Sequence, residues 1–242
     1  MKRQGSFRSN GVILYLKMKT SEKKAYDRFY NRYVKRMLDF VLAVILFIPV
    51  LPLYIIISVL ILLDDGFPVF YRPMRGGYRG RSFRIAKFRT MVKNADQIGG
   101  GTTANNDPRI TRVGRILRKT KLDETANLIN ILQGRMSFIG PRPELLQYTD
   151  QYQGAEKEIL EVRPGITDYS SIHFINLDEI VGAEDADAMY EKLVLKKKNA
   201  LRIQYAETVS FSADVRLFFQ TIRAVFQKSR RFIASEKQNK SL

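Results

Sequence analysis

The sequence predicts an α/β, mainly helical fold in a monotopic membrane protein, one that enters a bilayer and returns on the same side. Three observations predict this class. An uncharged apolar run at residues 40 to 63 is interrupted by prolines and flanked by basic residues. Two β-prone runs follow it, and the rest of the chain has mainly helical periodicity. We expect one re-entrant N-terminal membrane helix, a β-hairpin and interfacial amphipathic helices.

The apolar run, FVLAVILFIPVLPLYIIISVLILL, would extend about 36 Å as a straight helix, which is enough to cross a bilayer. A kinked span is therefore one interpretation. Pro49 and Pro52 favour another, because they lack the N–H groups that an uninterrupted helix needs. We expect a re-entrant hairpin with arms at residues 40 to 48 and 53 to 63.

The charge around this run supports re-entry. The chain has a formal net charge of +17, and residues 1 to 91 hold 18 lysines and arginines against five acidic residues. Basic flanks on both sides satisfy the positive-inside rule only when both ends stay cytoplasmic. We expect Lys35, Arg36 and Asp39 at headgroup level, where charges stay hydrated or pair with lipid phosphate.

The basic excess would also suit a nucleic acid. No nucleic-acid-binding motif accompanies the charge, however, and the apolar run has no role on DNA. Anionic lipid is the better partner, and we expect no nucleic acid. The run begins too far from residue 1, and lacks the cleavage site, for a signal peptide.

Two regular regions follow the apolar run. The β-prone runs PVFYR and SFRIAKFRT flank a loop rich in glycine and arginine, and predict a β-hairpin. Residues 107 to 119 predict a basic helix with Asp107 as N-cap and Pro108 in the first turn. Residues 121 to 133 predict a second helix, which Gly134 ends.

The C-terminal half contains two turns and two further helices. Proline and glycine predict turns at residues 140 to 144 and 163 to 167. A charged helix is expected over residues 186 to 206. Residues 211 to 226 carry an apolar stripe that fits either the core or the lipid interface. The stripe consists of Phe211, Val215, Phe218, Phe219, Ile222 and Phe226.

The residue types limit the chemistry. The chain has no cysteine and a single histidine, His173, which excludes thiolate nucleophiles, disulfides and cysteine- or histidine-rich metal sites. His173 could act as a general base, although a lone histidine is more often structural. Carboxylates, hydroxyls and lysines remain as nucleophiles, and a carboxylate works without a partner base.

One adjacent carboxylate pair, Asp123 and Glu124, stands out. Thr120 and Asp123 fit a capping box, so helix initiation is one interpretation. The segment also holds more positive charge than a cap requires, and a phosphate-bearing substrate would explain the excess. One carboxylate could attack phosphorus while the other binds Mg²⁺ together with substrate phosphates. The neighbouring cations are Arg112, Arg115, Arg118, Lys119 and Lys121.

Five motifs stand in order along residues 33 to 226. They are KRMLD (35–39), KFRTM (87–91), DPRITRVGRILRKTKLDE (107–124), GPRP (140–143) and RPGIT (163–167). In these motifs the chain resembles the bacterial sugar transferase family, the monotopic polyprenyl-phosphate phosphoglycosyltransferases. The resemblance implies transfer of a sugar 1-phosphate from a nucleoside diphosphate sugar, usually a UDP-sugar, to undecaprenyl phosphate.

The resemblance also implies roles for individual residues. Asp123 would be the nucleophile that forms a covalent phosphosugar intermediate, and Glu124 the Mg²⁺ ligand. Pro49 and Pro52 would carry the re-entrant break. The cations of the matching motifs would bind phosphate; they are Lys87, Arg89, Arg118 and Arg142.

By the same resemblance the chain would act at the cytoplasmic face of the bacterial inner membrane, among the small, catalytic-core-only members. Its partners would be the sugar nucleotide, undecaprenyl phosphate and the anionic bilayer, with a second copy of the chain as a further candidate. The expected segments are a basic extension (1 to 32), a re-entrant membrane helix (33 to 66), a cytoplasmic catalytic domain ending in an amphipathic helix (67 to 226) and a polar, frayed tail (227 to 242).

The chain departs from the family pattern at two places. Ile48 precedes Pro49 where the family usually has serine, and DYSSIHFINLDE follows RPGIT where many members carry tryptophan and asparagine.

Two other functions stay open. One is a non-catalytic membrane-surface adaptor that binds anionic lipid. The other is a phosphatidyl transferase, although such enzymes need several spanning helices and this chain has one apolar segment.

Overall fold

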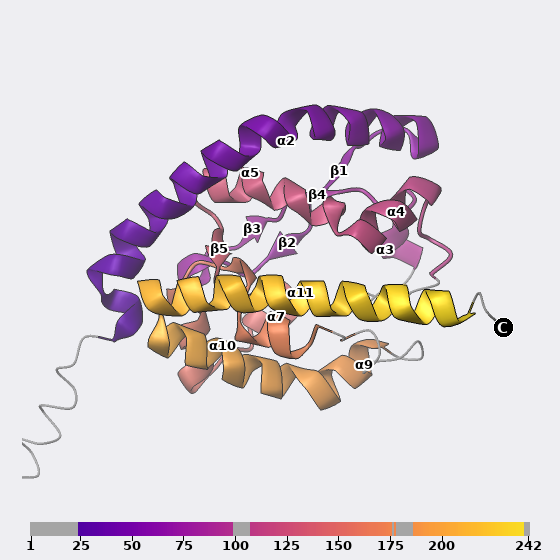
Figure 1. The fold of residues 1–242 in the computed structure, drawn as a ribbon. Coiled ribbons are helices and arrows are strands. Elements are labelled where there is room, and N and C mark those ends of the chain that lie inside the picture. The colour runs from indigo at the N-terminus through magenta and orange to yellow at the C-terminus, as the bar shows by residue number, and fades with distance from the viewer. Residues whose placement is uncertain (1–23, 99–106, 176, 178–185, 240–242) are drawn as a thin grey trace, which may run out of the picture.

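The computed structural model describes residues 24–98, 107–175, 177 and 186–239 of the 242-residue chain. The described part is mainly helical, with three two-stranded sheets. Helix α2 (Lys35–Asp65) arches over one side of the domain, and α10 (Lys196–Thr208) and α11 (Phe211–Asn239) lie across the other (Figure 1). The strands and the short helices α4 (Arg112–Thr120) and α5 (Asn127–Leu132) lie between them.

The remaining elements are short. The strands are β1 (Phe70–Tyr71), β2 (Met74–Arg75), β3 (Phe83–Arg84), β4 (Lys87–Phe88), β5 (Ser137–Ile139) and β6 (Gly165–Thr167). The other α-helices are α3 (Ala95–Ile98), α6 (Leu146–Thr149), α7 (Tyr169–His173) and α9 (Ala186–Tyr190). The 3₁₀ and π segments are η1 (Ala25–Asp27), η2 (Tyr30–Val34), η3 (Tyr78–Gly80), η4 (Leu122–Ala126), η5 (Gly154–Glu161) and η6 (Glu191–Leu195).

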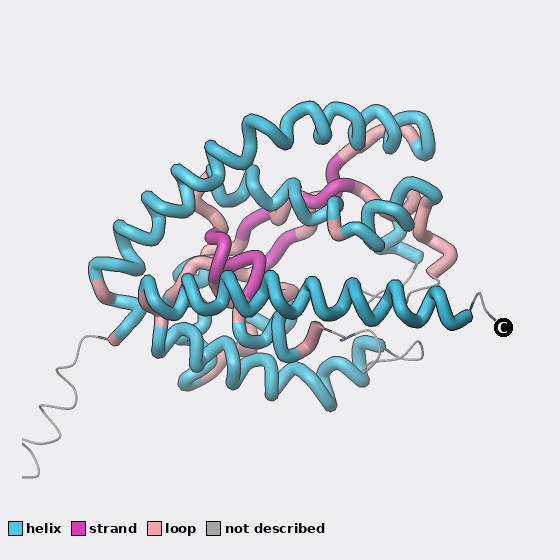
Figure 2. The backbone as a smooth tube through the Cα atoms, in the orientation of Figure 1, coloured by secondary structure: helices cyan, strands magenta, loops and turns pink. Residues whose placement is uncertain are grey.

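Helix α2 is continuous, with Pro49 and Pro52 inside it. The tube in Figure 2 stays helical through a bend and does not turn back on itself. The predicted hairpin with two separate arms is therefore not formed. Each proline removes one backbone hydrogen bond and displaces one carbonyl. A helix that is held at both of its ends therefore bends at the prolines and continues. By length and composition, the stretch Tyr30–Asp65 could cross a membrane.

The N-terminal end of α2 is bonded to the domain. The Lys35 ammonium lies 2.6 Å from a carboxylate oxygen of Asp214 in α11, and Asp39 accepts a hydrogen bond from the backbone N–H of Phe138. The Arg36 guanidinium donates to two carbonyls at the C-terminal end of α5. These three side chains are thus bonded to protein groups, and their position at headgroup level stays a prediction.

The C-terminal end of α2 is bonded to the same domain. Asp64 accepts a hydrogen bond from the N–H of Val113 at 2.9 Å. Arg89 donates to the carbonyls of Asp65 and Gly66 and forms an ion pair with the Asp65 carboxylate. Arg89 is therefore bonded to the C-terminal end of α2, and its predicted role in phosphate binding stays a prediction.

Between these ends, α2 has a buried face and an exposed face. Ala43, Tyr54, Ile57 and Ile61 pack against the domain. The opposite face is apolar and exposed; it includes Phe40, Val41, Ile45, Ile48, Ile55, Ile56, Val59 and Leu63. One side of α2 is therefore covered by protein along its length, and the other side presents hydrocarbon.

The predicted β-hairpin is confirmed. β1 pairs with β4 and β2 pairs with β3, both antiparallel, with Phe70 opposite Phe88 and Arg75 opposite Phe83. Buried Asn130 of α5 fixes the hairpin from below: its side chain accepts from the N–H of Ala86 at 2.7 Å and donates to the Arg84 carbonyl at 2.8 Å. These two hydrogen bonds help to position Lys87, the residue after Ala86.

The two predicted central helices are present with different starts. Helix α4 begins at Arg112, and its N-cap is Thr111, whose hydroxyl accepts from the N–H of Gly114. The Asp107 N-cap was wrong, because the Asp107 carboxylate is engaged by Arg109. The second helix consists of η4 and α5 and ends at Leu132, two residues before Gly134, whose φ is +76°.

The two proline-glycine turns lie against each other. β5 and β6 pair in parallel, with Ser137 opposite Gly165. A Cβ atom added to Gly140 would lie 2.3 Å from the carbonyl oxygen of Arg163, so this approach requires glycine. The contact fixes the GPRP turn and hence Arg142.

The C-terminal elements partly follow the prediction. The charged helix expected at residues 186 to 206 is seen as α9, η6 and α10. Helix α11 continues to Asn239, so the frayed tail predicted from residue 227 is not found up to that point. The predicted stripe of α11 is exposed, whereas Leu217 and Asp214 on another face are buried, so the stripe does not form core.

Candidate functional site

The acid pair lies where α4 turns into η4. α4 ends at Thr120, and Lys121 adopts a left-handed conformation with φ of +59° that redirects the chain. Asp123 and Glu124 follow at once in η4, which packs against β4. Three segments distant in sequence therefore meet here: the hairpin, η4 and the turn after β5.

Glu124 is held by two cations. Its Oε1 accepts from the Lys87 ammonium at 3.0 Å, and its Oε2 accepts from the Arg142 guanidinium at 3.0 Å. A second guanidinium nitrogen of Arg142 also contacts Oε1. Burial alone would raise the pKa of Glu124, but Arg142 and Lys87 override it and hold the pKa well below its ordinary value.

Asp123 has a different environment. The residue is 9% exposed, and its Oδ1 has no hydrogen-bond partner among the described residues. Burial and the adjacent charge of Glu124 raise the pKa of Asp123, against the opposing effect of Lys87. A buried carboxylate oxygen without a partner is uncommon, and it is available for bonding to a substrate or an ion.

The helix-capping interpretation of the pair fails. The hydroxyl of Thr120 donates to the carbonyl of Ile116 at 2.8 Å, within the preceding helix. No side-chain hydrogen bond caps η4. Asp123 is therefore not explained by helix initiation.

Arg118 is placed beside the pair by a close helix contact. Its Nε donates to the Thr90 hydroxyl at 2.9 Å, and its charge lowers the pKa of Asp123. α4 reaches Thr90 because Gly114 has no side chain, since a Cβ there would lie 2.0 Å from the Thr90 carbonyl oxygen. The structure thus gathers Lys87, Arg118 and Arg142 around the acids, while Arg89 bonds elsewhere.

The single histidine takes no part in these contacts. His173 is exposed at the end of α7, and its ring packs edge-on against Phe174.

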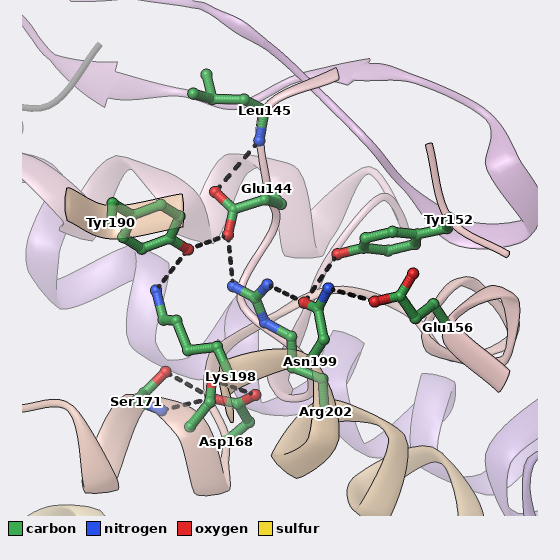
Figure 3. A network of polar contacts seen from close by, with 11 residues as sticks. Glu144, Leu145, Tyr152, Glu156, Asp168, Ser171, Tyr190, Lys198, Asn199 and Arg202 are labelled. Atoms are coloured by element: carbon green, nitrogen blue, oxygen red, sulfur yellow. Dashed lines mark hydrogen bonds and ion pairs between the residues drawn. The ribbon is translucent and has the colours of Figure 1, made fainter. Parts of the chain in front are cut away.

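A second polar cluster, missed by the sequence analysis, lies behind the GPRP turn. Glu144 follows that turn and accepts from Arg202 at 2.8 Å and from the Tyr190 hydroxyl at 2.5 Å (Figure 3). Burial opposes ionisation, but Arg202 and Lys198 lower the pKa of Glu144 to about 2. The available sequence signal was the spacing of Arg202 and Tyr205, three positions apart in the predicted charged helix and hence on one face of it.

The donor set at the pair fits a magnesium ion bound together with phosphate. Mg²⁺ takes one or two carboxylates and completes its shell with phosphate and water. The unpartnered Oδ1 of Asp123 and the remaining lone pairs of Glu124 are hard oxygen donors of this kind. Within the described residues no cluster of three acidic or histidine ligands exists, so a metal cage made of protein alone is not offered.

A buried acid pair among cations, beside a helix with an exposed apolar face, defines a class: membrane-associated proteins that handle phosphate groups. Comparison with known proteins gives the family. Residues 30–228 match the family model described as bacterial sugar transferase. The chain belongs to the bacterial sugar transferase family.

Individual relatives agree with this assignment. The exopolysaccharide production protein ExoY of Sinorhizobium fredii is 34% identical over 206 residues, covering 79% of this chain and 84% of the relative. The UDP-glucose:undecaprenyl-phosphate glucose-1-phosphate transferase of Escherichia coli is 34% identical over 196 residues, 79% of this chain and 40% of the relative. The UDP-N-acetylgalactosamine-undecaprenyl-phosphate N-acetylgalactosaminephosphotransferase of Aeromonas hydrophila is 35% identical over 200 residues, 80% of this chain and 44% of the relative. The chain thus spans less than half of these two longer transferases.

Proposed function

We propose that this chain transfers a sugar 1-phosphate from a nucleoside diphosphate sugar, with a UDP-sugar as the expected donor, to undecaprenyl phosphate. The reaction would begin surface glycan assembly at the cytoplasmic face of the inner membrane. Family membership and the names of the two longer relatives support the reaction class. The observation that carries the proposal is the buried, unpartnered Oδ1 of Asp123 beside Glu124, each of whose oxygens accepts a hydrogen bond from a cation.

The proposed reaction has two steps. Asp123 Oδ1 attacks the phosphorus that bears the sugar, the bond from this phosphorus to the bridging oxygen breaks, and the nucleoside monophosphate leaves with the electron pair. A phosphate oxygen of undecaprenyl phosphate then attacks the same phosphorus, and Asp123 leaves as a carboxylate. Because a soluble donor and a lipid acceptor use one site in turn, ping-pong kinetics follow.

The neighbouring charges have separate tasks in this proposal. Lys87, Arg118 and Arg142 offset negative charge on the phosphate oxygens in the transition state. Glu124 orients Lys87 and Arg142 and would hold Mg²⁺. The ion, when bound, would add positive charge at the same phosphates.

The first experiment measures UMP release by the purified protein in detergent. The assay contains Mg²⁺, undecaprenyl phosphate and each member of a panel of UDP-sugars, with Asp123→Asn measured alongside as the matched variant. UMP release that requires the lipid and one sugar, and that is lost in the variant, supports the proposal. Full activity of Asp123→Asn contradicts the nucleophile assignment. If no nucleotide is released, the assay is repeated with sugar nucleotides of other bases. Salt-sensitive binding to liposomes without release of any nucleotide would favour the non-catalytic membrane-surface adaptor.

We further propose that α2 is re-entrant. Both of its ends bond to one domain, and its buried face contacts that domain along its length, which supports re-entry over a straight crossing. The exposed stripe of α11 would lie in the lipid interface.

The topology is tested with single cysteines in this cysteine-free chain. Phe29→Cys and Arg81→Cys replace exposed residues on either side of α2. Both thiols should be protected from an impermeant reagent in intact cells and should react after lysis. Labelling of one of them in intact cells would establish a crossing helix instead.

A further inference from the structure

Tyr54 brings the membrane helix into contact with the acid-bearing segment. Its neighbours Ile55 and Ile56 are 61% and 57% exposed, whereas Tyr54 is 6% exposed. The Tyr54 hydroxyl donates a hydrogen bond to the carbonyl oxygen of Thr125, the residue after Glu124 in η4. A polar group in an apolar helix is thus directed at the backbone of the site.

The Tyr54 ring contacts the opposite side of the site as well. It packs edge-on against Phe88, with ring centroids 5.1 Å apart, and edge-on against Phe47 of its own helix at 5.8 Å. Phe88 follows Lys87 in β4. Tyr54 therefore touches the next residue after each member of the Lys87–Glu124 ion pair.

β4 and η4 are thus connected in two ways, by an ion pair and through Tyr54. From the site side, Lys87 and Glu124 join β4 to η4 at 3.0 Å. From the membrane side, the Tyr54 ring and hydroxyl join the same two segments, with Ala126 and Leu117 packed in the same cluster. The ring packs against Phe88 of β4, and the hydroxyl bonds to the backbone of η4. A displacement of η4 would move both Asp123 and Glu124.

We propose that Tyr54 is a positioning residue that fixes the acid pair from the membrane helix. The proposal rests on the proposed function for its kinetic test, and on the fold alone for its structural test. Tyr54 acts through the Thr125 carbonyl and Phe88, on the side of η4 that faces α2. The seating of α2 thereby becomes part of the geometry of the site, which explains why a polar hydroxyl is kept on the buried face of a membrane helix.

The kinetic test compares Tyr54→Phe with Ser58→Ala. Tyr54→Phe keeps the ring and removes the hydroxyl. Ser58→Ala also removes one hydroxyl from α2, but that hydroxyl donates to the Tyr54 carbonyl within the helix. With both variants in nanodiscs and rates expressed per folded molecule, Tyr54→Phe should lower kcat about tenfold with donor KM nearly unchanged. Ser58→Ala should match the parent. Parental kcat in Tyr54→Phe overturns the proposal.

The structural test does not depend on activity. Hydrogen–deuterium exchange of the backbone amides of residues 122 to 127 is measured in the parent and in both variants. Exchange should be faster in Tyr54→Phe and unchanged in Ser58→Ala. Equal exchange in Tyr54→Phe and the parent would overturn the positioning role. If the parent releases no nucleotide while Tyr54→Phe alters this exchange, the proposed function fails and the positioning role stands.

Discussion

Two buried acid clusters in this protein show how a structural carboxylate differs from one that is available for chemistry. Glu144 accepts from Arg202 and Tyr190, and the pKa of Glu144 falls to about 2 because Arg202 and Lys198 outweigh burial. Asp123 is also buried among cations, yet its Oδ1 lacks a partner in the described structure and its pKa is raised by burial. Both carboxylates have cations nearby, so the number of cations does not distinguish them. They differ in the hydrogen bonds that their oxygens accept.

The same comparison divides the adjacent pair. Glu124 resembles Glu144, because Lys87 and Arg142 occupy both of its oxygens and depress its pKa. Asp123 resembles neither. In the proposed function the two neighbours therefore have separate tasks, with Glu124 ordering the cations and Asp123 attacking phosphorus.

The largest expected effect is that of Asp123→Asn. Transfer should fall by about 10⁴-fold or more, because the attacking oxygen is lost. The pKa of Asp123 is raised in the folded state, so its charge costs stability at pH 7, and the neutral amide should raise Tm slightly. UMP release and thermal unfolding at pH 7 check both points. A lower Tm together with lost activity would make Asp123 a structural acid like Glu144.

Arg202→Met should be the most destabilising change in the comparison. It leaves Glu144 buried without its main cation, which typically costs about 3–5 kcal/mol of unfolding free energy. Arg135→Met, which removes an exposed guanidinium, is the control and should change Tm little. The measurement is thermal unfolding in detergent. An unchanged Tm in Arg202→Met would mean that Glu144 is not held as the structure indicates.

Glu124→Gln should have a smaller effect on stability, with a sign opposite to that of Asp123→Asn. A depressed folded-state pKa means that Glu124 stabilises the fold above its unfolded pKa, and that this contribution is lost as pH falls through the folded pKa. The variant should lose about 1–3 kcal/mol at pH 7, and the difference from the parent should shrink towards acid pH. Unfolding curves from pH 7 to pH 3 give the measurement. A loss that does not depend on pH would contradict the ion-pair assignment.

The smallest effect concerns the pH profile. If Asp123 must be charged to attack, kcat/KM should fall on the acid side with a midpoint above about 4, the ordinary pKa of aspartate. Lys121→Asn removes an exposed charge that lowers the pKa of Asp123, and asparagine tolerates the left-handed backbone at this position. The midpoint should therefore move further upward. A midpoint that moves down, or that lies at the ordinary value in the parent, would argue against the raised pKa.

Local sequence predicted part of the fold and failed where two good signals competed. The β-hairpin followed from alternating β-prone residues and a glycine-rich loop, and pairing confirmed it. Asp107 was as good an N-cap by type as Thr111, but Arg109 engages its carboxylate. Pro49 and Pro52 predicted a hairpin, and packing of α2 on the domain kept the helix continuous.

The sequence alone determined the apolar helix, the hairpin, the neighbouring acids and the motif cations, because these depend on residue type and spacing along a short stretch. The tertiary structure decided which cations reach the acids, which acid keeps a free oxygen, and that Lys35 and Arg89 fasten a helix. Lys35 meets Asp214 across 179 positions of sequence, and Arg142 meets Glu124 from a turn that packs closely on a second turn at Gly140 and Gly165. Charge pairing acts through space over a few ångströms, so a local pattern cannot fix it.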